Sequence, residues 1–141
     1  MADDGSDFAR SMSIATSGLR AQAGRMRVIS ENIANADSTA PNAGGNPYRR
    51  KVPTFSAALD RSLDAKVVTL GKVRTDQSAF RIKHEPSNPA ADAAGNVKYP
   101  NVNPLVEMTD MREAQRSYEA NLNIISATRR MIQRTLDILK A

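Results

Sequence analysis

The chain has 141 residues, which suits a single domain, and it carries a formal net charge of +5 with only 4% aromatic residues. It contains no cysteine, which excludes disulfides, thiolate metal sites and cysteine nucleophiles. The basic excess permits an anionic partner, but charges of both signs are mixed along the chain, and this mixture favours an ordinary solvated surface.

The first ten residues, MADDGSDFAR, are acidic and polar. They lack the basic region and the apolar region of a secretory signal peptide, so we expect no cleaved signal. We also expect no transmembrane segment, because no apolar run approaches the roughly 20 residues that a membrane-spanning helix needs.

Residues 7–35 predict a first long helix. Apolar residues recur there at alternating spacings of four and three, which is the heptad pattern of a coiled-coil seam with Gln22 as its one polar member. Gly18 and Gly24 either leave room for another backbone to approach closely or are merely tolerated, and both interpretations stay open. We expect the helix to end at Asn35, because asparagine tolerates the left-handed conformation that stops a helix. The seam consists of Phe8, Met12, Ala15, Leu19, Gln22, Met26, Ile29 and Ile33.

The middle of the chain differs from both ends, because all seven prolines lie between Pro41 and Pro104. Proline breaks helices, so this distribution predicts a helix, an irregular middle and a second helix. Four short runs rich in β-branched or aromatic residues, at 48–55, 67–75, 80–85 and 96–100, predict short strands in one or two hairpins. Residues 85–96 predict a turn-rich loop.

A second long helix is predicted from Pro104 to the end of the chain. Asn103 suits the N-cap, and Pro104 suits the first helical position. A second heptad seam follows, interrupted by the polar residues Gln115 and Arg129. It consists of Met108, Met111, Gln115, Tyr118, Leu122, Ile125, Arg129, Ile132, Leu136 and Leu139.

The two seams predict a mainly α fold, in which two long terminal helices form a coiled-coil hairpin with a small irregular β-rich middle insertion. We expect residues 1–35 and 104–141 to form a helical core domain and residues 36–103 to form a middle region. Two helices alone leave such seams half exposed, so we expect further helices to arrive from other subunits.

The sequence offers little for chemistry. His84 is the only histidine and stands in no catalytic motif, and the glycines form no phosphate-binding pattern. We therefore expect no enzyme activity, no cofactor and no metal site. The basic residues Arg49, Arg50, Lys51, Arg129, Arg130 and Arg134 could contact phosphates, but no nucleic-acid-binding motif accompanies them, and we expect no nucleic acid partner.

Two stretches carry a family resemblance. In SGLRAQAGRMRVISENIANADST, followed by YRRK, the residues Asn32, Ala34 and Asn35 match an Asn-Ala-Asn core, and Tyr48 matches a later tyrosine. Asn-Pro-Tyr replaces the usual Gly-Tyr, and APNAGG lengthens the loop between them. Residues 85–139, with their Tyr-Pro-Asn-Val turn and Arg-Ser-Tyr-Glu-Ala-Asn core, are the more specific part. Together the two stretches resemble the flagellar basal-body rod proteins, and among them the proximal rod type.

This resemblance implies export by the flagellar type III apparatus through an uncleaved N-terminal region, followed by assembly in the periplasm. The partners would be other rod subunits and further copies of the chain, and the terminal helices would form the inner coiled-coil layer of a hollow helical tube. The loop after the first helix would reach toward neighbouring subunits, with Tyr48 and Arg49 to Lys51 anchoring it.

Two other functions stay open: a coiled-coil adaptor or secreted component of a type III export system, and a helical nucleic-acid-binding protein. For the rod function, the expected assembly interface consists of Phe8, Met12, Leu19, Met26, Ile29, Ile33, Asn35, Tyr48, Met111, Tyr118, Leu122, Ile125, Ile132, Leu136 and Leu139.

Overall fold

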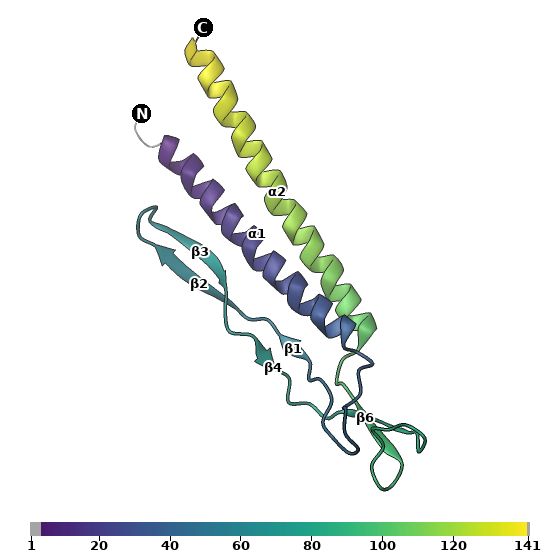
Figure 1. Cartoon of the computed structure of the whole chain (residues 1–141). Coiled ribbons are helices and arrows are strands. Elements are labelled where there is room, and N and C mark those ends of the chain that lie inside the picture. The colour runs from purple at the N-terminus through teal and green to yellow at the C-terminus, as the bar shows by residue number, and fades with distance from the viewer. Residues whose placement is uncertain (1–3, 141) are drawn as a thin grey trace. The chain divides into compact units, whose positions relative to one another are not determined.

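The computed structural model describes residues 4–140, so residues 1–3 and 141 of the expected helical core lie outside the described part. The described chain begins with one long helix and ends with another, and short strands lie between them in the sequence (Figure 1). This arrangement confirms the mainly α fold with a small β-rich insertion. The elements are α1 (Asp4–Ala34), β1 (Lys51–Val52), β2 (Phe55–Asp60), β3 (Ala65–Leu70), β4 (Arg74–Thr75), β5 (Arg81–His84), β6 (Asn96–Tyr99) and α2 (Pro104–Lys140).

The start of α2 is as predicted. The backbone N–H of Leu105 donates to Oδ1 of Asn103 at 3.1 Å, and the N–H of Glu107 donates to the carbonyl of Asn103 at 3.1 Å. Asn103 thus caps the helix with its side chain and accepts the first helical bond with its carbonyl.

The helix α1 ends close to the predicted residue, but it is not ended by a left-handed asparagine. The helix stops at Ala34, one residue early, and Asn35 is not left-handed, since Asp64 is the only non-glycine residue with positive φ in the described chain. Instead, both the backbone N–H and the side-chain Nδ2 of Asn35 donate to the carbonyl of Glu31, at 3.1 and 2.8 Å. The side-chain amide therefore helps to satisfy a carbonyl of the last turn, and a left-handed residue is not needed.

The strands form three antiparallel pairs of two strands each: β1 with β4, β2 with β3, and β5 with β6. In the longest pair, Phe55 lies opposite Leu70 and Asp60 lies opposite Ala65. Each of the four predicted runs contains strand residues, and the predicted turn-rich loop joins β5 to β6. No helix of the described chain is both long enough and apolar enough to cross a membrane.

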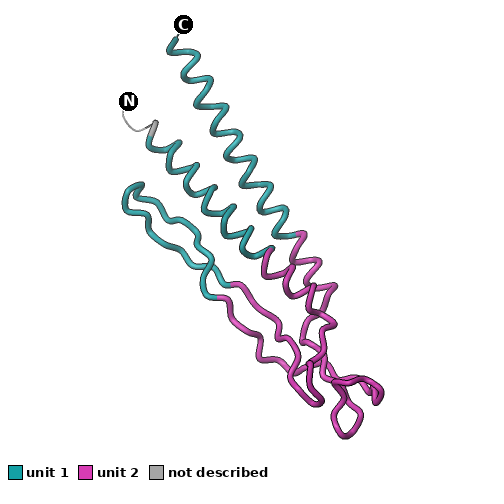
Figure 2. The backbone as a smooth tube through the Cα atoms, viewed as in Figure 1, with its two compact units in different colours: residues 1–26, 54–72, 113–141 teal, residues 27–53, 73–112 magenta. Residues whose placement is uncertain are grey.

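The chain divides into two compact units (Figure 2). Unit 1 comprises residues 1–26, 54–72 and 113–141, and unit 2 comprises residues 27–53 and 73–112. Each unit therefore contains part of both helices and part of the middle region.

Within unit 1, α1 runs antiparallel to α2 at close range. A Cβ atom placed on Gly18 would lie 2.9 Å from the side-chain amide of Asn121, and Nη2 of Arg25 lies 3.3 Å from Oε2 of Glu113. The contact on α2 moves back from residue 121 to residue 113 as the contact on α1 advances from residue 18 to residue 25, so the two helices run in opposite directions. Gly18 therefore faces the side chain of Asn121 on α2.

Also in unit 1, another side of α1 contacts the β2–β3 hairpin. Nε of Arg10 donates to the carbonyl of Leu63 at 2.8 Å, and the N–H of Val68 donates to Oγ of Ser17 at 3.1 Å. A Cβ atom on Gly24 would lie only 2.7 Å from a methyl carbon of Leu70. Gly24, like Gly18, therefore faces a side chain of a neighbouring element.

Unit 1 has no core of large side chains. Its fully buried residues in the described part are all small: Ala15, Ala21, Ala65, Ala114 and Thr128. In Figure 1, α1 lies between α2 and the hairpin, and it contacts both of them. A stable domain normally buries large apolar side chains in its core, whereas unit 1 leaves many of them exposed, among them Ile14, Leu59, Leu122 and Met131.

Unit 2 is built differently, because it buries larger apolar side chains. Val28 and Ile29 of α1 are buried, and so are Val97, Tyr99 and Val102 of the β6 region. Two polar side chains are enclosed in the same unit, and they form the centre of the site described next.

Candidate functional site: a buried polar network and exposed helix seams

Asn32 of α1 and Glu107 of α2 are the two enclosed polar side chains of unit 2, with exposed fractions of 1% and 0%. Nδ2 of Asn32 donates to Oε2 of Glu107 at 3.0 Å. Burying an amide and a carboxylate is costly unless each is fully hydrogen-bonded, so the remaining partners decide whether the site is stabilising.

Asn32 uses its whole hydrogen-bonding capacity. Its Nδ2 also donates to the carbonyl of Lys51 at 2.8 Å, while its Oδ1 accepts from the N–H of Lys51 at 2.9 Å and from the hydroxyl of Tyr48 at 2.8 Å. Two donors and two acceptor positions are therefore satisfied. Asn32 thus binds both ends of the segment from Tyr48 to Lys51 to α1.

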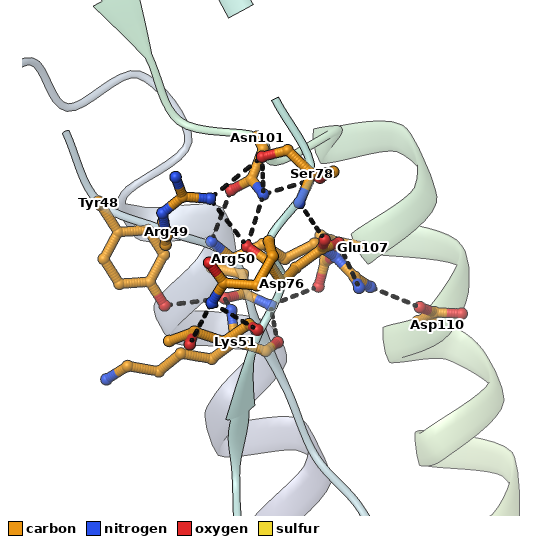
Figure 3. A network of polar contacts seen from close by, with 12 residues as sticks. Tyr48, Arg49, Arg50, Lys51, Asp76, Ser78, Asn101, Glu107 and Asp110 are labelled. Carbon is orange, nitrogen blue, oxygen red and sulfur yellow. Dashed lines mark hydrogen bonds and ion pairs between the residues drawn. The ribbon is translucent and has the colours of Figure 1, made fainter. Parts of the chain in front are cut away.

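Arg50 neutralises the buried carboxylate. Its Nε donates to Oε1 of Glu107 at 2.6 Å, and its terminal nitrogens lie 3.8 Å from a carboxylate oxygen of Asp76 and 3.7 Å from one of Asp110 (Figure 3). The backbone N–H of Arg50 donates to Oδ1 of Asn101 at 2.8 Å. A buried carboxylate needs both an opposite charge and hydrogen bonds, and Glu107 has both.

The neighbouring basic side chains also have partners inside unit 2. The Arg49 guanidinium donates to the carbonyls of Asp76 and Ser78 at 3.2 and 3.1 Å and lies 4.2 Å from the ring centre of Phe80. Nζ of Lys51 forms an ion pair with Glu31. The basic run YRRK is therefore engaged within its own unit. Whether it also contacts neighbouring subunits stays a prediction.

Tyr48 should titrate late. Burial first, and then the negative charges of Glu31 and Glu107, raise its pKa from 10.0 to about 12. A raised pKa means that the folded state keeps the proton when the unfolded state has lost it, so this contribution to stability is present below pH 10 and is lost as the pH rises toward 12. We expect a phenolate absorbance titration to show a late step that Tyr48→Phe removes. A late step that survives in Tyr48→Phe would contradict this assignment.

On α2 the residues of the predicted seam differ in burial. Met111, Tyr118, Ile125 and Ile132 are partly buried, as a seam requires. The second column of buried residues, however, is Glu107, Ala114 and Thr128, which lies one residue before the predicted column of Met108, Gln115, Leu122 and Arg129. Asn121, opposite Gly18, belongs to the same buried column. The buried column was missed because glutamate, alanine, asparagine and threonine do not give an apolar signal.

The other predicted interface residues lie in intermediate or exposed positions. On α1, Ile29 is buried, whereas Phe8, Met12, Leu19, Met26 and Ile33 are partly exposed. On α2, Leu122, Leu136 and Leu139 are exposed. Asn35 and Tyr48 are partly buried. The structure thus leaves many seam side chains open to solvent, and their role as an interface stays a prediction.

The single histidine lies at the end of β5. His84 is exposed, and its Nδ1 lies 3.3 Å from Oδ1 of Asn96. Within residues 4–140, no group of three or more histidine, cysteine or carboxylate side chains comes together in a way that could hold a metal ion.

Comparison with known proteins identifies the family. Residues 12–40 match the family model "Flagella basal body rod protein", and residues 93–138 match "Flagellar basal body rod FlgEFG protein C-terminal". The chain is 52% identical to the flagellar basal-body rod protein FlgC of Agrobacterium fabrum, over 91% of this chain and 92% of that protein. It is 38% identical to FlgC of Bacillus subtilis, over 92% and 97%, and 39% identical to FlgC of Salmonella typhimurium, over 89% and 92%. The chain therefore belongs to the FlgC family of flagellar basal-body rod proteins.

Proposed function

We propose that the chain is a structural subunit of the flagellar basal-body rod, which packs with further copies and with other rod subunits into a hollow helical shaft that transmits torque. Family membership supports this function, and it does not favour the adaptor alternative. The structural observation that carries the proposal is unit 1, which buries only small side chains in its described part and leaves many large apolar side chains exposed.

One broad side of unit 1 fits the expected assembly interface. Leu19 and Met26 each follow a residue that faces α2, and Leu122 follows Asn121, which faces α1. A step of one residue turns a side chain by about 100° around the helix axis. Because the two helices are antiparallel, the residues that follow the helix contacts, on α1 and on α2, turn to the same side of the helix pair. We call this side face A, defined by Leu19, Met26, Leu122 and Leu136; Met12 of the expected interface instead lines a cavity between α1 and the hairpin.

The two units would then have different tasks in assembly. Unit 2 has its own apolar core and the Asn32–Glu107 network, so it can order on its own. Helices whose apolar stripes lack a partner are marginal in water, so unit 1 should gain order when face A is covered. Folding of unit 1 and assembly of the rod would thereby be coupled.

We also propose that the subunit reaches a periplasmic part of the basal body through the flagellar type III apparatus, without cleavage of a signal. The absence of cysteine supports this route, because a chain that crosses an oxidising compartment unfolded then cannot form wrong disulfides.

A complementation experiment tests the function. A strain lacking the chain should be non-motile, and the wild-type chain should restore motility and appear in purified basal bodies. Leu122→Ala should weaken incorporation, since truncating a leucine that becomes buried costs about 2–5 kcal/mol. Asn123→Ala, at the next position, which is also exposed, is the matched control. Restored motility with no chain in the basal bodies would contradict the proposal and favour an export adaptor.

A further inference from the structure

The two strands of the hairpin in unit 1 have different surroundings. Strand β3 lies beside α1, and the N–H of Val68 in β3 donates to Oγ of Ser17 at 3.1 Å (Figure 1). An amide that points out of a hairpin belongs to a pair of opposite residues that do not bond each other, and Val68 lies opposite Ala57. The backbone groups of Ala57 therefore point away from β3, along the outer edge of β2.

The outer edge of β2 offers a row of free backbone groups. Bonded and non-bonded pairs alternate along an antiparallel ladder, so Phe55 and Leu59 point outward like Ala57. The N–H of Gly71 donates to the carbonyl of Thr54 at 2.6 Å, as this alternation requires. Within residues 4–140, no group bonds the outward N–H and C=O of Phe55, Ala57 or Leu59, and all three residues are exposed.

Strand β2 has none of the usual protection of a free edge. Proteins shield such edges with lysine, proline or a bulge, but Phe55–Asp60 contains neither residue type, and its six pairs with β3 follow an unbroken register. Phe55 and Leu59 share one face of the strand and are 44% and 56% exposed. A two-stranded hairpin is marginal in water, so this edge favours the addition of a further strand.

We propose that β2 pairs with β2 of a second copy of this chain, antiparallel about Ala57, and that free copies dimerise in this way. The result is a four-stranded sheet in which the two β2 strands are central and the two β3 strands are outermost. Each β3 already lies beside α1 of its own copy. The pairing therefore leaves no unprotected edge in either unit 1.

The other strands of the chain are poorer partners for this edge, because an added strand must bring free backbone groups of its own. The edge of β1 is occupied at Lys51, whose N–H and carbonyl both bind Asn32. The edge of β6 is occupied at Asn96, whose N–H and carbonyl both bind Asp92. Strand β4 has only two residues, and β5 carries two cations in four residues. Strand β2 has one charged residue, at its end.

Pairing about Ala57 also suits the side chains of β2. Phe55 of each copy lies opposite Leu59 of the other, and apolar cross-strand pairs of this kind stabilise a sheet. Asp60 lies opposite Thr54 of the other copy, so no like charges face each other. The contact is isologous and closes at two copies. It therefore belongs to free copies rather than to the elongating rod, and the inference does not rest on the proposed function.

Sedimentation equilibrium of the purified full-length chain tests this inference. Every variant carries Leu122→Glu, which blocks face A and leaves the edge of β2 unchanged. We expect a monomer–dimer equilibrium that Ala57→Pro weakens by about tenfold or more, because proline removes the central N–H of both copies. This N–H points out of the hairpin, so its loss spares the bonds between β2 and β3. Ala57→Ser keeps the N–H and is the matched control, with an unchanged dimer.

Cross-linking gives a readout that needs no proline in the strand. The chain has no cysteine, so Ala57→Cys introduces a single thiol. In the dimer the two thiols lie beside the two-fold axis, and a short bismaleimide should join them in high yield. Ser62→Cys, which is exposed between β2 and β3, is the matched control and should give little covalent dimer.

Several results would overturn the inference. A dimer of undiminished affinity in Ala57→Pro, or equal cross-linking yields from the two cysteine variants, would place the contact elsewhere. A chain that stays monomeric at every concentration, or that forms species larger than a dimer, would show that no closed pairing exists. A chain that is monomeric alone but binds another rod subunit through Ala57 would show that a second copy is not the occupant. None of these results bears on incorporation into the rod, which the complementation experiment measures separately.

Discussion

Glu107→Ala is expected to lower the free energy of unfolding by about 3–5 kcal/mol, the usual cost of breaking a buried ion pair by removing one partner. The carboxylate is fully enclosed, accepts from Nε of Arg50 at 2.6 Å and accepts from Nδ2 of Asn32 at 3.0 Å. Its removal leaves a guanidinium without its closest counter-charge and an amide donor without an acceptor. Urea denaturation followed by circular dichroism would measure the loss.

Two further variants isolate the cause of that loss. Glu119→Ala removes an exposed carboxylate from the same helix and should change stability by less than about 0.5 kcal/mol. Arg50→Met combined with Glu107→Leu removes both charges, and it should cost less than Glu107→Ala alone, because no uncompensated charge is left buried. If the double variant is the less stable of the two, the penalty does not come from the unpaired charge.

The network explains why the long loop after α1 can be ordered. Tyr48 and Lys51 bind Asn32 of α1, and Arg50 binds Glu107 of α2, so the loop returns to the helices at a defined place. The prediction that this segment acts as an anchor thus has a physical basis within unit 2, whether or not neighbouring subunits also bind it.

Sequence patterns predicted the elements whose signals are local. Asn103 and Pro104 marked the start of α2, and β-branched runs marked β3 and β5. The predicted strand at residues 48–55 included only the first residue of β2, Phe55. The rest of β2 was missed because its sequence, FSAALD, contains alanines, which are depleted in strands. Its conformation comes from pairing with β3 across the hairpin, which is a tertiary effect.

The site was harder to predict than the fold, because its central residues are polar. Asn32 stood in the family motif, but its four hydrogen bonds join residues far apart in the chain. Glu107 looked like an ordinary acidic residue in the first turn of a helix. No periodic pattern in a sequence distinguishes a buried carboxylate from an exposed one. The burial of Glu107 becomes evident only when the fold brings Arg50 beside it.

Asn32→Asp should be among the most disruptive single substitutions in the chain at neutral pH, although it changes one atom of the side chain. The two bonds that Oδ1 accepts, from Lys51 and Tyr48, can remain. The two that Nδ2 donates, to the carbonyl of Lys51 and to Glu107, are lost, and a second carboxylate oxygen then lies about 3.0 Å from Oε2 of Glu107. We expect a loss of about 3–5 kcal/mol in the free energy of unfolding at pH 7, comparable to that of breaking a buried ion pair.

The pH dependence of this variant gives the sharper test. Burial and the negative charge of Glu107 would raise the pKa of the new carboxyl in the folded state above its value in the unfolded chain. Between these two values the folded state binds the extra proton and the unfolded state does not, so the free energy of unfolding should rise as the pH falls from 7 toward 5. The protonated carboxyl can again donate to Glu107, which restores one of the lost bonds. Asn123→Asp, at an exposed position of α2, should show no such recovery. If Asn32→Asp is equally unstable at pH 7 and pH 5, repulsion between the two carboxylates is not what destabilises it.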